Sequence, residues 1–207
     1  MMRRPSVLAL MAAAGIIALT GCSDDGTSIN AQMRQGDQKG YVAGTGLVEQ
    51  LPPQERTTTI DLDGTTLDGQ SWSTSEHRGE VLVINVWGSW CGPCVAEVPD
   101  LEQVATEKED AGQPVQFIGV NVRDTVPNAT AFQKVHGVSY PSLVDDGGRT
   151  LAQLKGLAVA RPTTMILDGQ GRLAARVNGQ VNASTLRGLV DDVLADEPGA
   201  DPAGATG

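Results

Sequence analysis

The segment Val-Leu-Val-Ile-Asn-Val-Trp-Gly-Ser-Trp-Cys-Gly-Pro-Cys, residues 81–94, places two cysteines shortly after an apolar run. Residues 81–87 have the length and β-branched content of a buried strand, and residues 95–108 are typical of a helix. The cysteines therefore lie where a strand turns into a helix. Two thiols separated by two residues either form a disulfide or share a metal ion, so the rest of the sequence must decide between these chemistries.

The start of the predicted helix favours negative charge on Cys91. The first backbone N–H groups of a helix have no partners within it and point toward its N-terminal end. We therefore expect the pKa of Cys91 to lie below the free value of about 8.5. Cys91 is the predicted nucleophile, and Cys94, one turn further along and more shielded, is predicted to resolve a mixed disulfide. Pro93 suits the first helical turn, where its missing N–H costs little.

Length and composition indicate one globular domain with additional segments. The chain has 207 residues, of which 40% are hydrophobic, enough to supply a core. Its formal net charge is -10, with acidic residues scattered along the chain and no basic patch. We therefore expect no nucleic-acid partner.

The first 22 residues are predicted to be an export leader. They combine two arginines with an apolar segment, residues 7–19, whose length suits a signal peptide better than a membrane span. The leader ends in Leu-Thr-Gly-Cys, which resembles the bacterial lipobox, so Cys22 is predicted to carry a lipid anchor. The three cysteines then divide into one anchor and one redox pair. The alternative is a plain cleaved leader or an uncleaved anchor, in which Cys22 has no role.

A tether and one folded domain are predicted after the leader. Residues 23–56 are rich in Gly, Asp, Gln, Ser and Thr and lack apolar periodicity, which is typical of a flexible tether. The alternative is that Val48 and its apolar neighbours pack as an N-terminal strand onto the domain. The folded domain is predicted over residues 57–196, and a disordered tail over residues 197–207.

The predicted domain begins with a β-hairpin and continues with alternating strands and helices. Residues 57–60 and 65–72 form the predicted hairpin around an Asp-Gly turn. The alternation that follows predicts a parallel sheet with crossovers, and a turn at residues 168–171 predicts an antiparallel pair at its end. The other predicted elements are strands at 81–87, 115–122, 163–167 and 172–177 and helices at 95–108, 128–136, 149–155 and 183–195.

Residues 83–99 closely resemble the TlpA/ResA-like thioredoxins, which are membrane-tethered thiol-disulfide oxidoreductases of bacteria. The matching sequence is Val-Ile-Asn-Val-Trp-Gly-Ser-Trp-Cys-Gly-Pro-Cys-Val-Ala-Glu-Val-Pro. Further matches are Tyr-Pro-Ser-Leu-Val-Asp at 140–145 and Arg-Pro-Thr-Thr-Met-Ile-Leu-Asp at 161–168, and the resemblance covers about residues 57–195. It implies an α/β, thioredoxin-like fold with a central mixed sheet flanked by helices and an N-terminal β-hairpin extension. We expect no cofactor besides the cysteine pair.

The resemblance also implies roles for Pro162 and Arg161. In the family, the proline of this motif has a cis peptide bond and lies beside the two cysteines. Its ring presents no N–H that would compete near the sulfur atoms. The backbone of Arg161 is then free to pair with an extended substrate segment by strand addition. From the residues alone, a trans proline at the start of an edge strand is an equal alternative.

Asn85 and Glu97 bear on how protons reach the thiols. Cytoplasmic thioredoxin carries a buried Asp where this chain has Asn85, and an amide does not exchange protons as a carboxylate does. Glu97 matches the acidic residue that the TlpA/ResA-like proteins place near their thiols. It would raise thiol pKa values through its charge and pass on the proton of Cys94. The alternative is that a Glu early in a helix only compensates the helix dipole.

Substrate contact is predicted around the two cysteines. A tryptophan next to the nucleophile shields it and offers partners an apolar surface. Histidine titrates near neutral pH, but His77 and His136 have no ligand spacing to the cysteines, so solvated or capping roles are predicted for both. The predicted substrate-contact residues are Trp90, Gly92, Pro93 and Arg161.

These features predict a lipid-anchored reductase on the extracytoplasmic face of the bacterial cell membrane. It would take electrons from a membrane thiol donor of the CcdA/DsbD type and reduce disulfides in exported proteins. Apocytochrome c is the substrate that the resemblance implies. The Gly-Pro dipeptide between the cysteines favours a low, reducing potential like that of thioredoxin. The potential of thioredoxin is about -270 mV, whereas that of a strong oxidant is about -120 mV.

The sequence alone does not exclude two other functions. The same thiols would also serve an oxidant that introduces disulfides, or a copper or zinc chaperone. A structural zinc site needs four ligands, and the chain has no second Cys or His pair, so we expect no bound metal. Peroxide reduction is disfavoured because peroxiredoxins carry a Pro and a Thr or Ser before a lone peroxidatic cysteine. This chain has neither arrangement. We expect a monomer.

Overall fold

The computed structural model of the chain describes residues 41–43 and 46–197. The predicted leader at residues 1–22, with Cys22, and the predicted tail beyond Glu197 therefore lie outside the described residues. Within the described part, none of the helices combines the length and apolar character needed to span a membrane.

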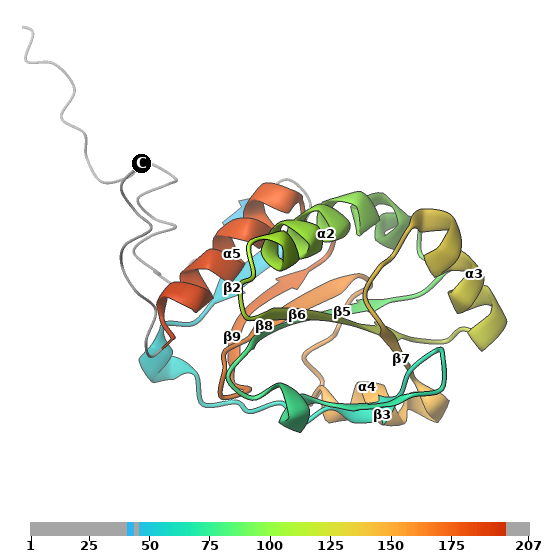
Figure 1. Ribbon diagram of the computed structural model, residues 1–207, viewed down its shortest axis with the longest axis horizontal. Helices are drawn as coiled ribbons and strands as arrows, with labels where there is room; N and C mark the ends of the chain where they lie inside the picture. Colours follow the sequence, from blue (N-terminus) through green and yellow to red (C-terminus); the bar gives the residue numbers. More distant parts are fainter. Residues whose placement is uncertain (1–40, 44–45, 198–207) are drawn as a thin grey trace, which may run out of the picture. The chain divides into compact units, whose positions relative to one another are not determined.

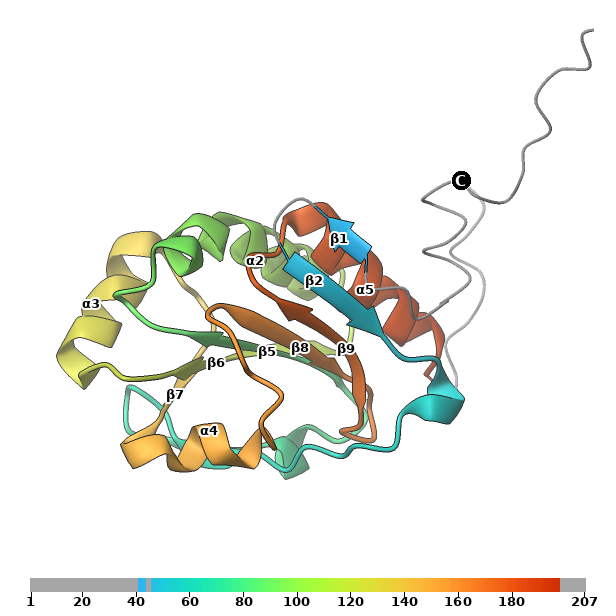
Figure 2. The ribbon, with the colours of Figure 1, turned by 180° about the vertical axis from the view of Figure 1, so that it is seen from behind.

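A seven-stranded mixed sheet forms the centre of the fold (Figures 1 and 2). Its strand order is β1-β2-β9-β8-β5-β6-β7. The central strand β5 runs parallel to β6 and antiparallel to β8, and β6 runs parallel to β7. The strands are β1 (Tyr41–Ala43), β2 (Gly46–Gln50), β5 (Val81–Trp87), β6 (Val115–Asn121), β7 (Ser142–Val144), β8 (Thr163–Leu167) and β9 (Leu173–Asn178).

Helices and a small hairpin cover the two faces of this sheet. In Figure 1, α2 and α5 lie over one face, while α4 and β3 lie over the other. The second sheet is a hairpin of β3 (Asp63–Thr65) and β4 (Ser71–Ser73). The prediction of a central mixed sheet flanked by helices is confirmed. The helices are α2 (Gly92–Asp110), α3 (Val126–His136), α4 (Arg149–Gln153) and α5 (Ala183–Ala195), with short 3-10 helices at Pro53–Glu55, Thr74–His77 and Asp146–Gly148.

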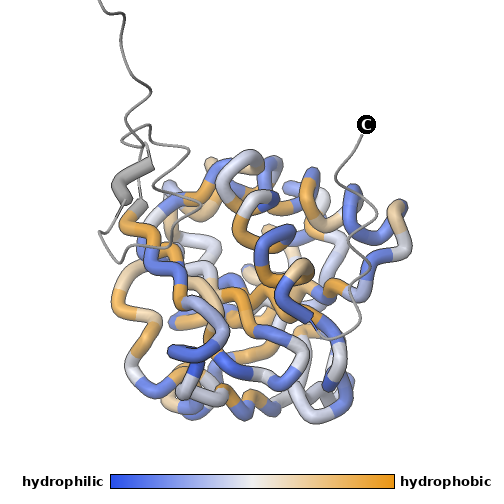
Figure 3. The backbone as a smooth tube through the Cα atoms, turned by 90° about the vertical axis from the view of Figure 1, so that its left-hand side faces the viewer, coloured by the Kyte–Doolittle hydropathy of each residue, from blue (hydrophilic) through white to orange (hydrophobic). Residues whose placement is uncertain are grey.

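All seven residues of β5 are buried, because the strand lies inside the sheet and both faces of the sheet are covered. Successive side chains of a strand point to opposite faces. Val81 and Val83 pack in the cluster that includes α2 and α5, whereas Leu82 and Ile84 pack in the cluster that includes residues of α4. Figure 3 shows hydrophobic segments running through the middle of the fold. The same alternation turns Asn85 toward the α2 face.

The predicted N-terminal hairpin exists, but its strands lie elsewhere. Residues 57–60 contribute a single bridge, between Thr59 and Arg172 of the main fold. The hairpin forms later, because the predicted Asp-Gly turn at residues 63–64 is itself part of β3. The reason is burial: Ile60 and Leu62 are almost fully buried against the sheet, so this segment lies along the core rather than in the hairpin.

The prediction of a tether over residues 23–56 is wrong from Tyr41 onward. Strand β2 pairs antiparallel with β9 and extends the sheet, and β1 pairs with β2. The alternative, in which residues around Val48 add a strand to the domain, is therefore the one observed. Arg56 then fixes the end of this segment: its side chain is buried and lies between the carboxylates of Asp168 and Asp196.

Gly119 of β6 marks the closest packing in the sheet. A Cβ atom at this position would lie 2.0 Å from Oγ of Ser142 and 2.6 Å from Nε1 of Trp87. That hydroxyl accepts hydrogen bonds from Trp87 Nε1 at 3.1 Å and from Gln133 Nε2 at 3.0 Å. Only glycine leaves room for this arrangement between β5, β6 and β7.

We predict that Gly119→Ala destabilises the fold while Gly188→Ala stabilises it. The methyl group at position 119 must displace Ser142 and Trp87, so unfolding in urea should show a loss of about 1–3 kcal/mol. Gly188 is exposed in α5, with no atom within 4 Å of an added Cβ, so alanine there should gain about 0.5–1 kcal/mol. Equal urea midpoints for the two variants would contradict the packing at Gly119.

Candidate active site

The candidate site lies at the sheet edge where β5 and β6 end. These strands are parallel, so the residues after Trp87 and after Asn121 meet at one edge. Strand β8 is antiparallel to β5 and pairs Thr163 with Val86, so the loop before β8 reaches the same edge. Three loops, at residues 88–91, 122–125 and 156–162, thus converge there. Side chains at this edge are the candidates for chemistry.

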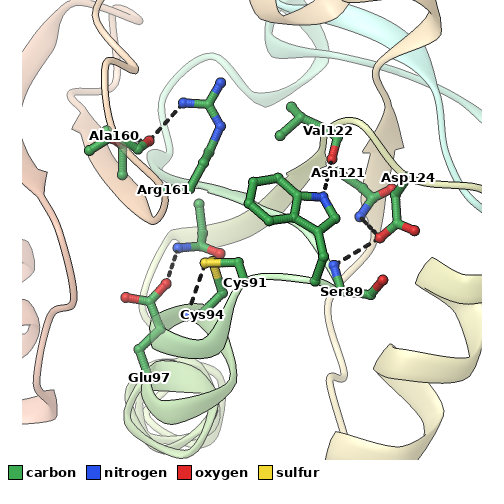
Figure 4. Close-up of a disulfide and its surroundings, with 12 residues drawn as sticks. Ser89, Cys91, Cys94, Glu97, Asn121, Val122, Asp124, Ala160 and Arg161 are labelled. Carbon is green, nitrogen blue, oxygen red and sulfur yellow. Dashed lines mark hydrogen bonds between the residues drawn. A yellow bond between two sulfur atoms is a disulfide. The ribbon is translucent and has the colours of Figure 1, made fainter.

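Cys91 and Cys94 form a disulfide at the start of α2 (Figure 4). Cys91 caps the helix, because its sulfur atom accepts a hydrogen bond from the backbone N–H of Cys94 at 3.3 Å. Both side chains are buried, whereas Gly92 and Pro93 between them are exposed. The predicted position at a strand-to-helix turn is confirmed, although the helix begins at Gly92, three residues earlier than expected. Their roles as nucleophile and resolving thiol stay predictions.

Glu97 is completely buried, one helical turn after Cys94. Its Oε1 accepts a hydrogen bond from Asn85 Nδ2 at 2.7 Å, and its Oε2 accepts one from the backbone N–H of Val181 at 3.2 Å. The same amide of Asn85 also donates to Thr164 Oγ1 at 3.2 Å. Glu97 therefore lies beyond the first turn of α2 and is buried. Compensation of the helix dipole, the alternative role, does not explain this position. Asn85 and Glu97 form one polar pair beneath the disulfide.

Burial raises the pKa of Glu97 to about 8. The hydrogen bonds from Asn85 and Val181 favour the carboxylate and offset part of this effect, while the charge of Asp100 adds to the rise. The desolvation of a buried carboxylate thus outweighs its hydrogen bonds. A group with this pKa both gives and takes protons near neutral pH, which is what a proton-transfer residue needs.

The loop before β8 places Arg161 and Pro162 beside the site. The peptide bond between them is cis, as the resemblance implied. One guanidinium nitrogen of Arg161, Nη1, donates hydrogen bonds to the carbonyl groups of Ala158 at 2.8 Å and Ala160 at 2.7 Å. Thr163 Oγ1 also donates to the carbonyl of Ala160 at 3.0 Å. The side chains of Arg161 and Thr163 therefore bind carbonyl groups of the loop that precedes them and stabilise its conformation.

Trp90 is an exposed ring with a fixed orientation. Half of its surface, 53%, is accessible, yet Nε1 donates to the carbonyl of Val122 at 3.2 Å. The ring folds over Gly88, where a Cβ atom would lie 2.6 Å from Nε1. Trp90 thus combines an apolar surface with a defined position, which suits the predicted substrate contact.

Asp124 is a site residue that the sequence reasoning missed. Its carboxylate accepts hydrogen bonds from the backbone N–H of Ser89 at 2.8 Å, Asn121 Nδ2 at 3.2 Å and the backbone N–H of Thr125 at 2.9 Å (Figure 4). Partial burial raises the pKa of Asp124, but these hydrogen bonds outweigh it and hold the pKa below its usual value. The available signal was a polar run directly after a buried strand.

The two histidines are not brought to the disulfide by the strands that form the site. His77 precedes β5 and so lies toward the opposite edge of the sheet, where it stacks on Trp72 and contacts Glu80. His136 ends α3 and packs against Phe132. Within the described residues, no group of three His, Cys, Asp or Glu side chains is placed to hold a metal ion.

Comparison with known proteins identifies a family model and relatives that match this chain. The Redoxin family model matches residues 50–193. The thiol:disulfide interchange protein HelX of Rhodobacter capsulatus is 32% identical over 56% of this chain. The thiol-disulfide oxidoreductase ResA of Bacillus thuringiensis subsp. konkukian is 24% identical over 56% of this chain. The matches span 62% of HelX and 65% of ResA, a little less than two thirds of each relative.

A solved structure extends the comparison to the fold. The crystal structure of a DsbF homologue from Corynebacterium diphtheriae superposes with a TM-score of 0.65 and 34% sequence identity. It covers 73% of this chain and 96% of its own. The described fold is accordingly thioredoxin-like, as the resemblance implied.

We predict that Glu97 makes the stability of the oxidised protein fall as pH rises from 4.5 to about 8. Between these values the folded protein binds one proton more than the unfolded chain, whose glutamate has the ordinary pKa of 4.5. Glu97→Gln removes this titration, so the stability difference between wild type and variant should change by a few kcal/mol, on the order of 1.4 per unit of pKa shift. Urea unfolding across this pH range measures it.

Glu107→Gln is the matched control. Hydrogen bonds from Arg187 lower the pKa of Glu107 to about 2, so its titration affects stability only below pH 4.5. This variant should keep the wild-type slope between pH 5 and 8. A Glu97→Gln slope equal to that of wild type would show that Glu97 is ionised in the folded protein throughout.

Proposed function

The chain belongs to the Redoxin family, and we propose that it is an extracytoplasmic thiol-disulfide oxidoreductase that reduces disulfides in exported proteins. The observation that carries this proposal is the Cys91–Cys94 disulfide at the start of α2, above a buried carboxyl group. Relatives of the chain have names that describe thiol-disulfide chemistry. The cysteine pair supplies two electrons, and Glu97 supplies a site for one proton.

In the first step, the thiolate of Cys91 attacks one sulfur atom of the substrate disulfide. The substrate S–S bond breaks, a mixed disulfide forms on Cys91, and the released substrate thiolate takes up a proton from solvent. The N-terminal end of α2 favours negative charge on the attacking sulfur. Trp90, Gly92 and Pro93 offer the exposed surface around it, and the backbone of Arg161 pairs with the extended substrate segment.

In the second step, Cys94 resolves the mixed disulfide. Its thiol must first lose a proton, and the carboxylate of Glu97, one turn further along α2, accepts it. The thiolate of Cys94 then attacks the sulfur of Cys91, which forms the internal disulfide and releases the second substrate thiol. Two electrons have passed from the enzyme to the substrate. A donor dithiol restores the reduced pair by the same exchange in reverse.

The surroundings of Cys94 favour the reductive direction. A strong oxidant gains its potential because its reduced form is stabilised. Here Cys94 is buried near the carboxyl group of Glu97, so desolvation disfavours a thiolate on Cys94, and the charge of Glu97 adds to this effect above pH 8. The Gly-Pro dipeptide between the cysteines points the same way.

The remaining parts of the proposal concern location and partners. Cys22 would carry a lipid that holds the domain on the outer face of the cell membrane, with the residues before the domain as a tether. A membrane dithiol protein of the CcdA/DsbD type would then donate electrons, and apocytochrome c, during cytochrome c maturation, would be one substrate. The lipobox-like ending of the leader and the family resemblance support these assignments.

Cys94→Ser should accumulate mixed disulfides in cells, whereas Cys91→Ser should accumulate none. The first variant keeps the attacking thiol but lacks the resolving one, so the covalent intermediate persists. Non-reducing electrophoresis and mass spectrometry of the captured proteins identify both substrate and electron donor. Capture by Cys91→Ser alone would reverse the two roles.

The reduction potential of the pair should lie nearer about -270 mV than about -120 mV. Equilibration with glutathione redox buffers, followed by alkylation of free thiols, measures it on the purified chain. Above pH 8, where Glu97 is ionised, Glu97→Gln should shift the potential upward, because a neutral amide no longer disfavours a thiolate on Cys94. A wild-type potential above about -150 mV would contradict the proposed reductase and favour a disulfide-forming oxidant.

A further inference from the structure

Two arginines lie at the same sheet edge as the disulfide. Arg123 is in the loop after β6, and Arg161 is in the loop before β8. Because β6 is parallel and β8 antiparallel to β5, both loops come to the end of β5 that leads into Cys91. The two cations are close enough to interact: burial and then the charge of Arg123 lower the pKa of Arg161.

The guanidinium groups of both residues keep hydrogen-bond donors for a ligand. Arg161 is held through Nη1 alone, by the carbonyl groups of Ala158 and Ala160, which limits its motion. Arg123 is exposed and has a backbone φ of 52°, in the left-handed region. Among the described residues, neither takes part in an ion pair; the arginines that do are Arg56, Arg78, Arg172, Arg176 and Arg187.

The nearest acidic side chains have other partners. Asp124 directly follows Arg123, but its two oxygen atoms accept the three hydrogen bonds from Ser89, Asn121 and Thr125. Asp145 attracts Arg161, yet it forms no ion pair with it, and its Oδ1 accepts the backbone N–H of Leu151 at 2.9 Å. Neither carboxylate is therefore positioned to neutralise the two guanidinium groups by direct contact.

Exposed apolar side chains lie in or next to the same converging loops as these cations. Trp90 is 53% exposed and held over Gly88, while Val159, two residues before Arg161, is 73% exposed. Val126, at the start of α3, is 41% exposed. We call this surface the active-site rim; its members are Trp90, Arg123, Val126, Val159 and Arg161.

We infer that the active-site rim binds an extended substrate segment that carries a carboxylate side chain next to its target cysteine. The inference rests on the proposed function and names its substrate class. Trp90 and Val159 would contact the apolar part of the segment, and the two arginines would bind its Asp or Glu side chain through charge-assisted hydrogen bonds. The net charge of -10 would by itself favour basic partners, so this preference runs against the overall charge.

The test compares three short peptides, each closed by one disulfide, that differ only in the residues flanking the cysteines: both Glu, both Gln or both Lys. The reduced full-length chain, in excess over the peptide, is the reductant. Acid quenching followed by chromatography of the reduced peptide gives the second-order rate constant, the single-turnover equivalent of kcat/KM, at low and high salt. The Glu peptide should exceed the Gln peptide by about three- to tenfold, and the Lys peptide should be the slowest. Salt should reduce the difference, because exposed ion pairs are screened.

Variants locate the preference. Arg123→Gln and Arg161→Gln should each lower the ratio of Glu-peptide to Gln-peptide kcat/KM. Lys134→Gln removes the same charge from an exposed position about 12 Å along α3 from its start, and it should leave the ratio unchanged. Equal rates for the three peptides, or an unchanged ratio in both arginine variants, would overturn the inference while the reductase function stands. Turnover of none of the peptides would overturn the proposed function and this inference with it.

Discussion

The hydrogen bond from Asn85 to Glu97 joins the central strand to the helix that begins at the disulfide. It exists because the alternation of side chains along β5 turns residue 85 toward α2, and because Glu97 follows Cys94 by one helical turn. A carboxyl group without such a partner would not be stable in this dry position. The bond therefore links β5 to α2 directly beneath the disulfide, beside the apolar contacts that Leu101 and Val104 of α2 make with the core.

The rest of the site follows from strand direction. Parallel and antiparallel neighbours of β5 bring three loops to one edge, although their sequences are far apart. Close packing acts at two places near this edge: Gly88 lets the ring of Trp90 fold back, and Gly119 lets Trp87 and Ser142 of the neighbouring strands meet. Asp124 ties the loop after β6 to the turn before Cys91 through the N–H of Ser89. These contacts tie the segments around the disulfide to one another.

Much of this could be predicted from the sequence, because some signals are local. Strand β5 is a continuous apolar run, and α5 has apolar residues at helical spacing, so both were predicted with the observed bounds. Strand β7 was not predicted, and β2 was foreseen only as an alternative to the tether, because short strands at or near a sheet edge carry little pattern of their own and form through pairing with distant partners. Sequence motifs identified four residues of the site: Cys91, Cys94, Glu97 and Pro162. Asp124 and Arg123 were not predicted, because they reach the site only through the pairing of β6 with β5. No local sequence pattern indicates this pairing.

The two sulfur atoms differ in their surroundings more than in their exposure, which is 4% for Cys91 and 1% for Cys94. In Figure 4, Glu97 and Arg161 lie on opposite sides of the disulfide. Cys91 has the N-terminal end of α2 and the cationic loops near it, so negative charge on its sulfur is favoured. Cys94 has the buried carboxyl group of Glu97 near it, and in the proposed reaction this group takes up the proton of Cys94 before the mixed disulfide is resolved. The order of the two steps in the proposed reaction therefore follows from where the fold places the end of α2 and the buried carboxyl group.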